Sequence, residues 1–201
     1  MKETGIIMSG DHPKLILEGK KTITRRVIES KLLMLPHTLE VYKEADHYEA
    51  RWISKAGVNH YCNDLLAHCP YGGVGDRLWV KETFWHPPIY VGDVFAGLIK
   101  KDTSIVSYKA NLEPHQAERQ IWKPSIFMPR WASRITLEIT EVRVERLQEI
   151  SHDDVGAEGL SNAINNPLFF PTVWDSLNAK RGFGWETNPF VWCISFKRVD
   201  N

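Results

Sequence analysis

Lys21 and Thr24 lie three residues apart in the segment EGKKTITRR, residues 18–26. A threonine hydroxyl becomes a useful nucleophile only when a base takes its proton, and a lysine can be that base when burial or a cationic neighbour lowers its pKa. The other lysine and the two arginines of the segment could supply that cation. A carboxylic acid elsewhere in the chain could then protonate a departing nitrogen. On residue types alone, an exposed cationic turn remains the favoured interpretation.

Other site chemistries lack the residue spacing that they need. Cys62 and Cys69, with His60 and His68 beside them, do not have the spacing of a zinc knuckle, and no second pair of ligands follows. The glycines of GGVGD precede a strand pattern, whereas a phosphate-binding loop leads into a helix. We therefore expect a site without metal or cofactor. Because the chain has 3 cysteines, an odd number, we also expect free thiols and no structural disulfide.

The composition sets limits on the partners. With 25 basic and 25 acidic residues the net charge is +0, so the chain has no global field that would attract nucleic acid or an anionic membrane, and an anionic partner would need a local patch. No apolar run approaches the roughly 18 residues of a membrane span, and the first residues lack the apolar core of a signal peptide. We expect a cytoplasmic protein without a membrane partner.

The elements around the Lys–Thr pair can be predicted from capping residues and alternation. Asp11 is a suitable N-cap and Gly19 a suitable left-handed end for a short helix over residues 11–19. The alternating, β-branched run at 22–27 predicts a strand with Thr24 and Arg26 on one face.

Further along the chain, strands dominate. The pattern predicts a hairpin within 39–53, a turn and strand over 73–84, a short strand at 105–108, a long strand over 132–147 that bends or bulges near Glu141, and a closing strand over 189–199. One short helix should begin after Ser151, with Asp154 three residues on, and carry Glu158; another should cover 171–182 and end at Gly182. No alternation of strands and helices appears, so we predict a mainly β, α+β fold: a small β-barrel or strongly curved sheet with helices at its rim.

Several of the 8 tryptophans stand next to arginine or proline. Tryptophan and arginine together can form stacking platforms for bases, although a core role is the commoner one for any single tryptophan. Two of them, Trp79 and Trp131, could stack on a base, and Glu82 or Arg130 could hydrogen-bond its edge.

The segment EGKKTITRR resembles the G-x-K-x-x-x-x-R signature of the ASCH family, which has a PUA-like β-barrel; Gly19, Lys21 and Arg26 occupy its fixed positions. GDRLWV, ITEVRVERLQEISHDDVGAEGL and VWCISFKR resemble the later strands and helix of that family. The resemblance implies a single domain over 1–201 with insertions at about 29–70 and 85–120. That match covers the barrel elements, about half of the chain, and the remainder resembles a longer subgroup carried by bacteriophages and prophages.

Within that family the chain resembles a small bacterial N4-acetylcytidine amidohydrolase. The resemblance implies a catalytic set of Lys21, Thr24 and Glu158, no cofactor, and a nucleoside or RNA ligand. The expected reaction is hydrolysis of the amide of an acylated pyrimidine nucleoside, in which Arg26 holds Glu158 or stabilises the oxyanion. Three alternatives remain open: a module that binds RNA or a modified nucleotide, a metal-independent ribonuclease, and a phage-associated protein without catalysis. The sequence leaves the oligomeric state open.

Overall fold

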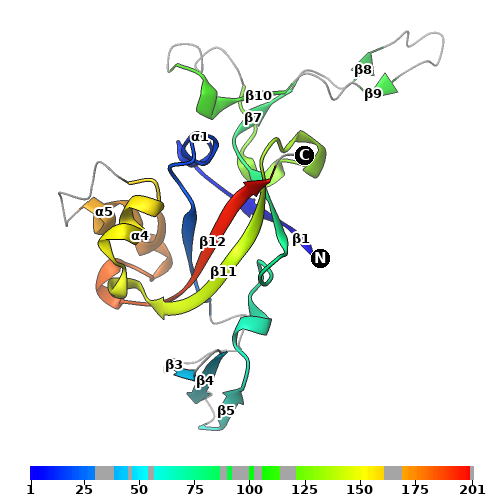
Figure 1. The fold of residues 1–201 in the computed structure, drawn as a ribbon. Helices are drawn as coiled ribbons and strands as arrows, with labels where there is room; N and C mark the ends of the chain where they lie inside the picture. The colour runs from blue at the N-terminus through cyan, green and yellow to red at the C-terminus, as the bar shows by residue number, and fades with distance from the viewer. Residues whose placement is uncertain are drawn as a thin grey trace.

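A five-stranded sheet is the centre of the fold (Figure 1). The structure is a computed structural model that describes residues 1–29, 39–44, 47–53, 57–86, 90–91, 100–101, 106–113, 121–160 and 169–199. The strand order is β1-β6-β11-β12-β2, with β1 parallel to β6 and the other neighbours antiparallel. The strands are β1 (Glu3–Ile7), β2 (Ile23–Val27), β6 (Arg77–Lys81), β11 (Thr136–Arg146) and β12 (Phe190–Val199). The described elements confirm a mainly β fold with short helices.

The predicted irregularity in the long strand is present. The register of β11 against β12 shifts between Ile139 and Glu141. Apolar side chains occupy odd positions up to Ile139 and even positions from Val142 onward, and both sets are buried. One extra residue at the bulge changes the phase of the alternation, so both halves of β11 keep their apolar side chains in the core.

The sheet is not closed by backbone pairing in the described part of the chain, because β1 and β2 are its two edges. A side chain joins these edges: Arg26 on β2 donates from Nη2 to the carbonyl oxygen of Ile7 at the end of β1, at 2.5 Å. Of the two predicted forms, a small barrel or a strongly curved sheet, the curved sheet therefore matches the backbone hydrogen bonding of the described strands.

Besides the central sheet, the described residues form three smaller ones. Strands β3 (Leu39–Glu44), β4 (His47–Ile53) and β5 (Asn59–Cys62) form an antiparallel sheet, which confirms the hairpin within 39–53. Tyr48 and Ala50 on β4 belong to the same buried cluster as Ile6 and Val80. Two further pairs are β7 (Phe84–Trp85) with β10 (Ser107–Tyr108), and β8 (Tyr90–Val91) with β9 (Lys100–Lys101). Ile105, predicted in the strand at 105–108, lies outside the described residues, and the insertions at 29–70 and 85–120 stay a prediction.

The described residues form three α-helices, and Figure 1 shows two of them, α4 (His152–Ala157) and α5 (Phe169–Asn178), together on one side. α4 begins as predicted, since the Ser151 hydroxyl accepts a hydrogen bond from the Asp154 N–H at 3.1 Å. It ends one residue earlier than predicted, which makes Glu158 its C-cap. Short 3-10 helices complete the described elements: Leu66–His68, Lys109–Asn111, Ser125–Phe127, Arg130–Ala132, Leu147–Glu149, Ala179–Arg181 and Trp185–Thr187.

The first helix, α1 (His12–Leu17), matches the prediction in its place and differs in its cap. Asp11 stands at the N-cap position without a side-chain hydrogen bond to the helix. Gly19 has φ +70°, the left-handed conformation expected at its end. Gly182, with φ +85°, likewise ends the 3-10 turn that continues α5.

All three cysteines are free, as predicted. Of the helices that the structure describes, none has the length and apolar character needed to cross a membrane.

Candidate functional site

Lys21 and Glu158 meet where two short helices end. Lys21 follows α1, and its N–H donates to the Leu15 carbonyl in the turn that closes the helix. Glu158 is the C-cap of α4. The two residues form an isolated antiparallel bridge, extended by a hydrogen bond from the Thr22 N–H to the Ala157 carbonyl at 2.8 Å. Backbone pairing thus places two side chains together that are far apart in the sequence.

The side chains of Lys21 and Glu158 form a buried ion pair. Lys21 Nζ lies 2.5 Å from Glu158 Oε2 and 2.9 Å from the Glu158 carbonyl oxygen. The two residues are 1% and 7% exposed. Burial lowers the pKa of Lys21 because the charged ammonium loses its hydration, and the Glu158 carboxylate opposes that shift. The structure therefore brings Lys21 into contact with Glu158, the acid of the expected set.

Arg25 contacts the same carboxylate from the other side, and the sequence prediction missed this role. Its Nη1 lies 3.5 Å from Glu158 Oε1. Its Nε and Nη2 lie 2.8 and 2.5 Å from Glu145 Oε1, and Nη2 also donates to Asp154. Arg26 is expected to hold Glu158 or to stabilise the oxyanion; the arginine that contacts Glu158 is Arg25, which leaves the oxyanion role of Arg26 a prediction. Strand pairing places Arg25 beside Cys193, and Cys193 beside Arg143. This register is the signal that could have identified the role of Arg25.

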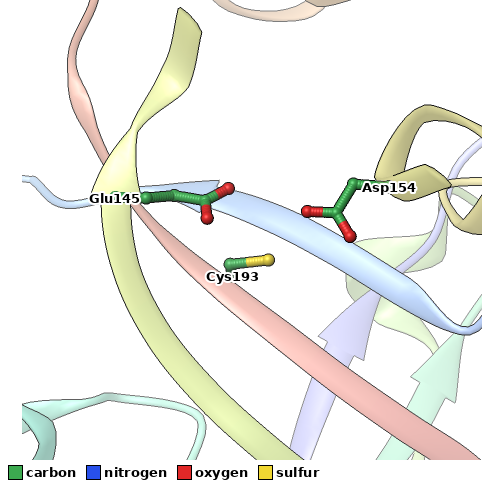
Figure 2. Close-up of side chains that lie close together, drawn as sticks. All are labelled: Glu145, Asp154 and Cys193. Atoms are coloured by element: carbon green, nitrogen blue, oxygen red, sulfur yellow. The ribbon is translucent and has the colours of Figure 1, made fainter. Parts of the chain in front are cut away.

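Glu145, Asp154 and Cys193 form a compact group next to this pair. Figure 2 shows the three side chains converging from β11, α4 and β12, and their ligand atoms lie within 4.8 Å of one another. Guanidinium groups already contact these atoms: besides Arg25, Arg143 Nη2 lies 2.7 Å from Asp154 Oδ2 and 3.1 Å from Cys193 Sγ. Burial raises the pKa of the Cys193 thiol to about 12, so it is protonated near neutral pH. The group therefore belongs to a charge network that anchors Arg25.

A cavity of about 280 Å³ opens beside Glu158, between β2 and α5. Its polar wall carries Thr24, Arg25, Arg26 and Glu158. Its apolar wall comes from α5, whose Phe170, Val173, Trp174 and Leu177 follow the i, i+3, i+4, i+7 spacing of one helix face. The charged groups of one wall therefore face the aromatic surface of the other.

The apolar wall is held in place by its own contacts. Phe170 and Trp174 stack with ring centroids 6.3 Å apart, and Trp174 Nε1 donates to the Phe183 carbonyl at 2.8 Å. Both rings also pack in a buried cluster with Leu147 and Val191. The wall is therefore a fixed surface that a flat apolar ligand group can contact without reorganisation.

His12 and Tyr71 add neutral polar groups to the cavity lining. Burial, followed by the charge of Lys21, lowers the pKa of His12 to about 4, so its imidazole is neutral near neutral pH. Burial raises the pKa of Tyr71, so its hydroxyl keeps its proton. Neither residue was singled out from the sequence, because neither stands in a pattern with Lys21.

The structure brings together some of the predicted site residues. Thr24, 4% exposed, lines the cavity with Glu158 and Arg26. Lys21 lies behind Glu158, and its two ammonium contacts go to that residue. Within the described residues, the Thr24 hydroxyl has no hydrogen-bond partner, so it is free to meet a ligand.

The other four predicted residues lie elsewhere and do not line this cavity. Trp79 and Trp131 pack against a separate buried cluster around Phe84. Glu82 forms a two-pronged ion pair with Arg134, with both distances 2.9 Å. Arg130 pairs with Glu3 at 3.0 Å, on the exposed side of β1.

No protein-family model and no curated protein matches the chain. Among solved structures, the chain is similar to an ASCH domain from Lactobacillus crispatus JV V101, with 12% identity and a TM-score of 0.40. It is also similar to protein EF3133 from Enterococcus faecalis V583, described as family-model DUF984, with 12% identity and a TM-score of 0.43. Each comparison covers 100% of this chain and 81% of the other.

Proposed function

We propose that the chain is an ASCH-family hydrolase that cleaves the amide bond of an acylated pyrimidine nucleoside such as N4-acetylcytidine. One observation carries the proposal: the buried Lys21 ammonium lies 2.5 Å from the Glu158 carboxylate, which lines the same cavity as Thr24. A buried charge pair is costly to desolvate, and ionisable groups whose pKa values are shifted by burial are concentrated at catalytic sites.

The roles follow from the chemistry of the three groups. Burial lowers the pKa of Lys21 and so favours its uncharged amine. In the reactive form, Lys21 would have passed a proton across the 2.5 Å contact to Glu158. Lys21 would take the Thr24 proton as Oγ1 attacks the acyl carbon, and Glu158 would give its proton to the departing nitrogen as the amide C–N bond breaks. Water, losing a proton to the Glu158 carboxylate, would then attack the acyl–threonine ester. As the ester C–O bond breaks, Lys21 would return its proton to Thr24 Oγ1, and the carboxylic acid would be released.

The size and lining of the cavity favour a small ligand with a flat ring. At about 280 Å³ the cavity is close to the lower end of typical small-molecule sites, which begin at roughly 300 Å³. Phe170 and Trp174 offer an aromatic surface for a pyrimidine. The acyl group would then lie toward Thr24 on the opposite wall.

Product analysis with N4-acetylcytidine tests the proposal. Wild type should release cytidine and acetate; Thr24→Ala should lower kcat by a factor of about 100 or more, and Thr24→Ser should keep part of the activity. Thr22→Ala is the matched control because Thr22 is exposed. If Thr24→Ala keeps its activity while Glu158→Gln loses it, water rather than threonine is the nucleophile. Absence of hydrolysis of every N4-acylated cytidine by wild type would contradict the proposal.

A second candidate is a non-catalytic module that binds a modified nucleotide or RNA, which the aromatic wall of α5 favours. It predicts that the Thr24→Ala variant still binds the nucleotide or RNA and that the wild type forms no product. The ribonuclease alternative predicts RNA cleavage that withstands a metal chelator and is lost in Lys21→Ala.

A further inference from the structure

The arginines that line the cavity differ in their charge partners. Arg25 lies within ion-pair distance of three carboxylates, and Arg181 pairs with Glu29. Arg26 has no carboxylate within 4.0 Å among the residues that the structure describes. Arg26 therefore forms no ion pair within the described part of the protein. The charge of Glu158 acts on it from a longer distance, but that carboxylate is already paired with Lys21 and Arg25.

The hydrogen bonds of Arg26 are also incomplete. Its Nη2 donates to the Ile7 carbonyl at 2.5 Å and contacts Met8 Sδ at 3.4 Å. Its Nε is buried and has no hydrogen-bond partner among the residues that the structure describes. A buried N–H without an acceptor costs free energy, and an arginine keeps its charge in such a place. A bound anion would supply both the missing charge and the missing acceptors.

Neutral groups that can donate hydrogen bonds lie along the same cavity. The Tyr71 hydroxyl keeps its proton, and the neutral imidazole of His12 carries one N–H. The acids of the lining are both paired: Glu29 with Arg181, and Glu158 with Lys21 and Arg25. The surroundings of Arg26 thus favour an anion over a cation.

We infer that Arg26 forms an anion subsite, and that the ligand is a phosphorylated nucleoside, such as a nucleoside 5′-monophosphate, rather than a free nucleoside. The inference rests on the proposed function for the base and its acyl group. Thr24 and Arg26 are two residues apart on one strand, so their Cα atoms lie about 7 Å apart. A nucleotide is long enough to reach from one side chain to the other while its base contacts α5.

Calorimetry with cytidine, cytidine 5′-monophosphate and inorganic phosphate tests the inference on the full chain. Wild type should bind the monophosphate about tenfold more tightly than cytidine, as expected for a charge-assisted contact. Arg26→Gln should bind both with equal affinity and should lose phosphate binding. Arg77→Gln is the matched control, because the Arg77 Nε is also buried without a partner but Arg77 does not line the cavity.

A second variant avoids the risk that Arg26→Gln disturbs the contact with β1. Glu29→Gln removes a carboxylate from the cavity and releases Arg181, so it should raise the affinity for the monophosphate several-fold more than the affinity for cytidine. Equal binding of cytidine and its monophosphate by wild type, with no phosphate binding, would overturn the inference.

The outcomes separate this inference from the proposed function. Hydrolysis of N4-acetylcytidine without any preference for the monophosphate would overturn the subsite alone. Phosphate binding that depends on Arg26, without hydrolysis of any acylated nucleoside or nucleotide, would support the subsite and contradict the hydrolase.

Discussion

Lys21 Nζ donates two hydrogen bonds to one residue, Glu158: one to its carboxylate at 2.5 Å and one to its carbonyl oxygen at 2.9 Å. The second bond ties the ammonium to the backbone at the end of α4, so the orientation of the pair depends on the fold as well as on the attraction between the charges. A buried pair with this geometry makes both residues sensitive to loss of the partner.

Lys21→Met should destabilise the fold by about 3–5 kcal/mol, because it leaves the Glu158 carboxylate buried without its closest cation. The double variant Lys21→Met with Glu158→Met should recover much of that loss, since no unpaired charge remains. The free energy of unfolding in urea measures both effects.

The matched control for that experiment is an exposed ion pair. Lys197 lies 2.7 Å from Glu138 with a side chain 59% exposed, so Lys197→Met should cost about 0–1 kcal/mol. Equal losses for Lys21→Met and Lys197→Met would show that burial adds nothing to the Lys21–Glu158 pair.

Gly159→Ala should disturb the site through the backbone that follows Glu158. Gly159 has φ +88°, and a Cβ there would lie 2.9 Å from Leu15 Cδ1 and 3.3 Å from Lys21 Cβ. Gly182→Ala is the control, because Gly182 has φ +85° with nothing within 4 Å of the added atom. Both variants lose roughly 1 kcal/mol from the left-handed backbone, and Gly159→Ala should lose about 1–3 kcal/mol more from the contacts. Equal unfolding free energies would contradict the close packing.

The stability of the protein should fall in mild acid because of His12. Its pKa is about 4 in the folded chain and 6.5 when unperturbed. Between these values the unfolded chain binds more protons at this site, so the stabilising contribution is complete above about 6.5 and is lost as the pH falls toward 4. The loss should be at most about 3 kcal/mol, because His12 is partly exposed.

Urea unfolding at a series of pH values measures this contribution. His12→Gln should flatten the decline between pH 6.5 and about 4. The control is His152→Gln, because His152 is exposed in the first turn of α4, and this variant should keep the wild-type slope. An unchanged slope in His12→Gln would assign the acid sensitivity to other groups.

Arg25→Met should cost about 3 kcal/mol or more, because three partly or fully buried carboxylates lose their shared cation. Arg25→Lys should recover only part of the loss, since an ammonium cannot reproduce the fork of the guanidinium. The difference should persist at high salt, because buried charges are weakly screened. Thermal unfolding of the three proteins at low and high salt is the measurement, and a loss that disappears at high salt would place the network at the surface.

The sequence predicted correctly those features whose cause lies within a single helix or strand. The change of phase between Ile139 and Val142 predicted the bulge in β11, and Ser151 predicted the start of α4. Gly19 predicted the end of α1. In each case the physical cause lies within a few residues, in alternation, in a capping hydroxyl or in a left-handed backbone.

Predictions about the site were weaker where they needed distances between elements. Trp79, Glu82, Arg130 and Trp131 were chosen by residue type and lie away from the cavity. Arg25 was treated only as a neighbouring charge, yet it links Glu158 to the network on β11 and α4. Residue type alone does not decide which face of a strand reaches which helix.

By itself, the sequence determined that Lys21 and Thr24 stand together at the start of a strand, because a short helix, its glycine end and an alternating run are local features. Only the tertiary structure decided that Glu158 meets Lys21 and that α5 supplies the facing wall of the cavity. These contacts depend on the pairing of β2 with β12 and on the packing of α4 and α5 against the sheet, and such long-range packing is set by the burial of the whole core.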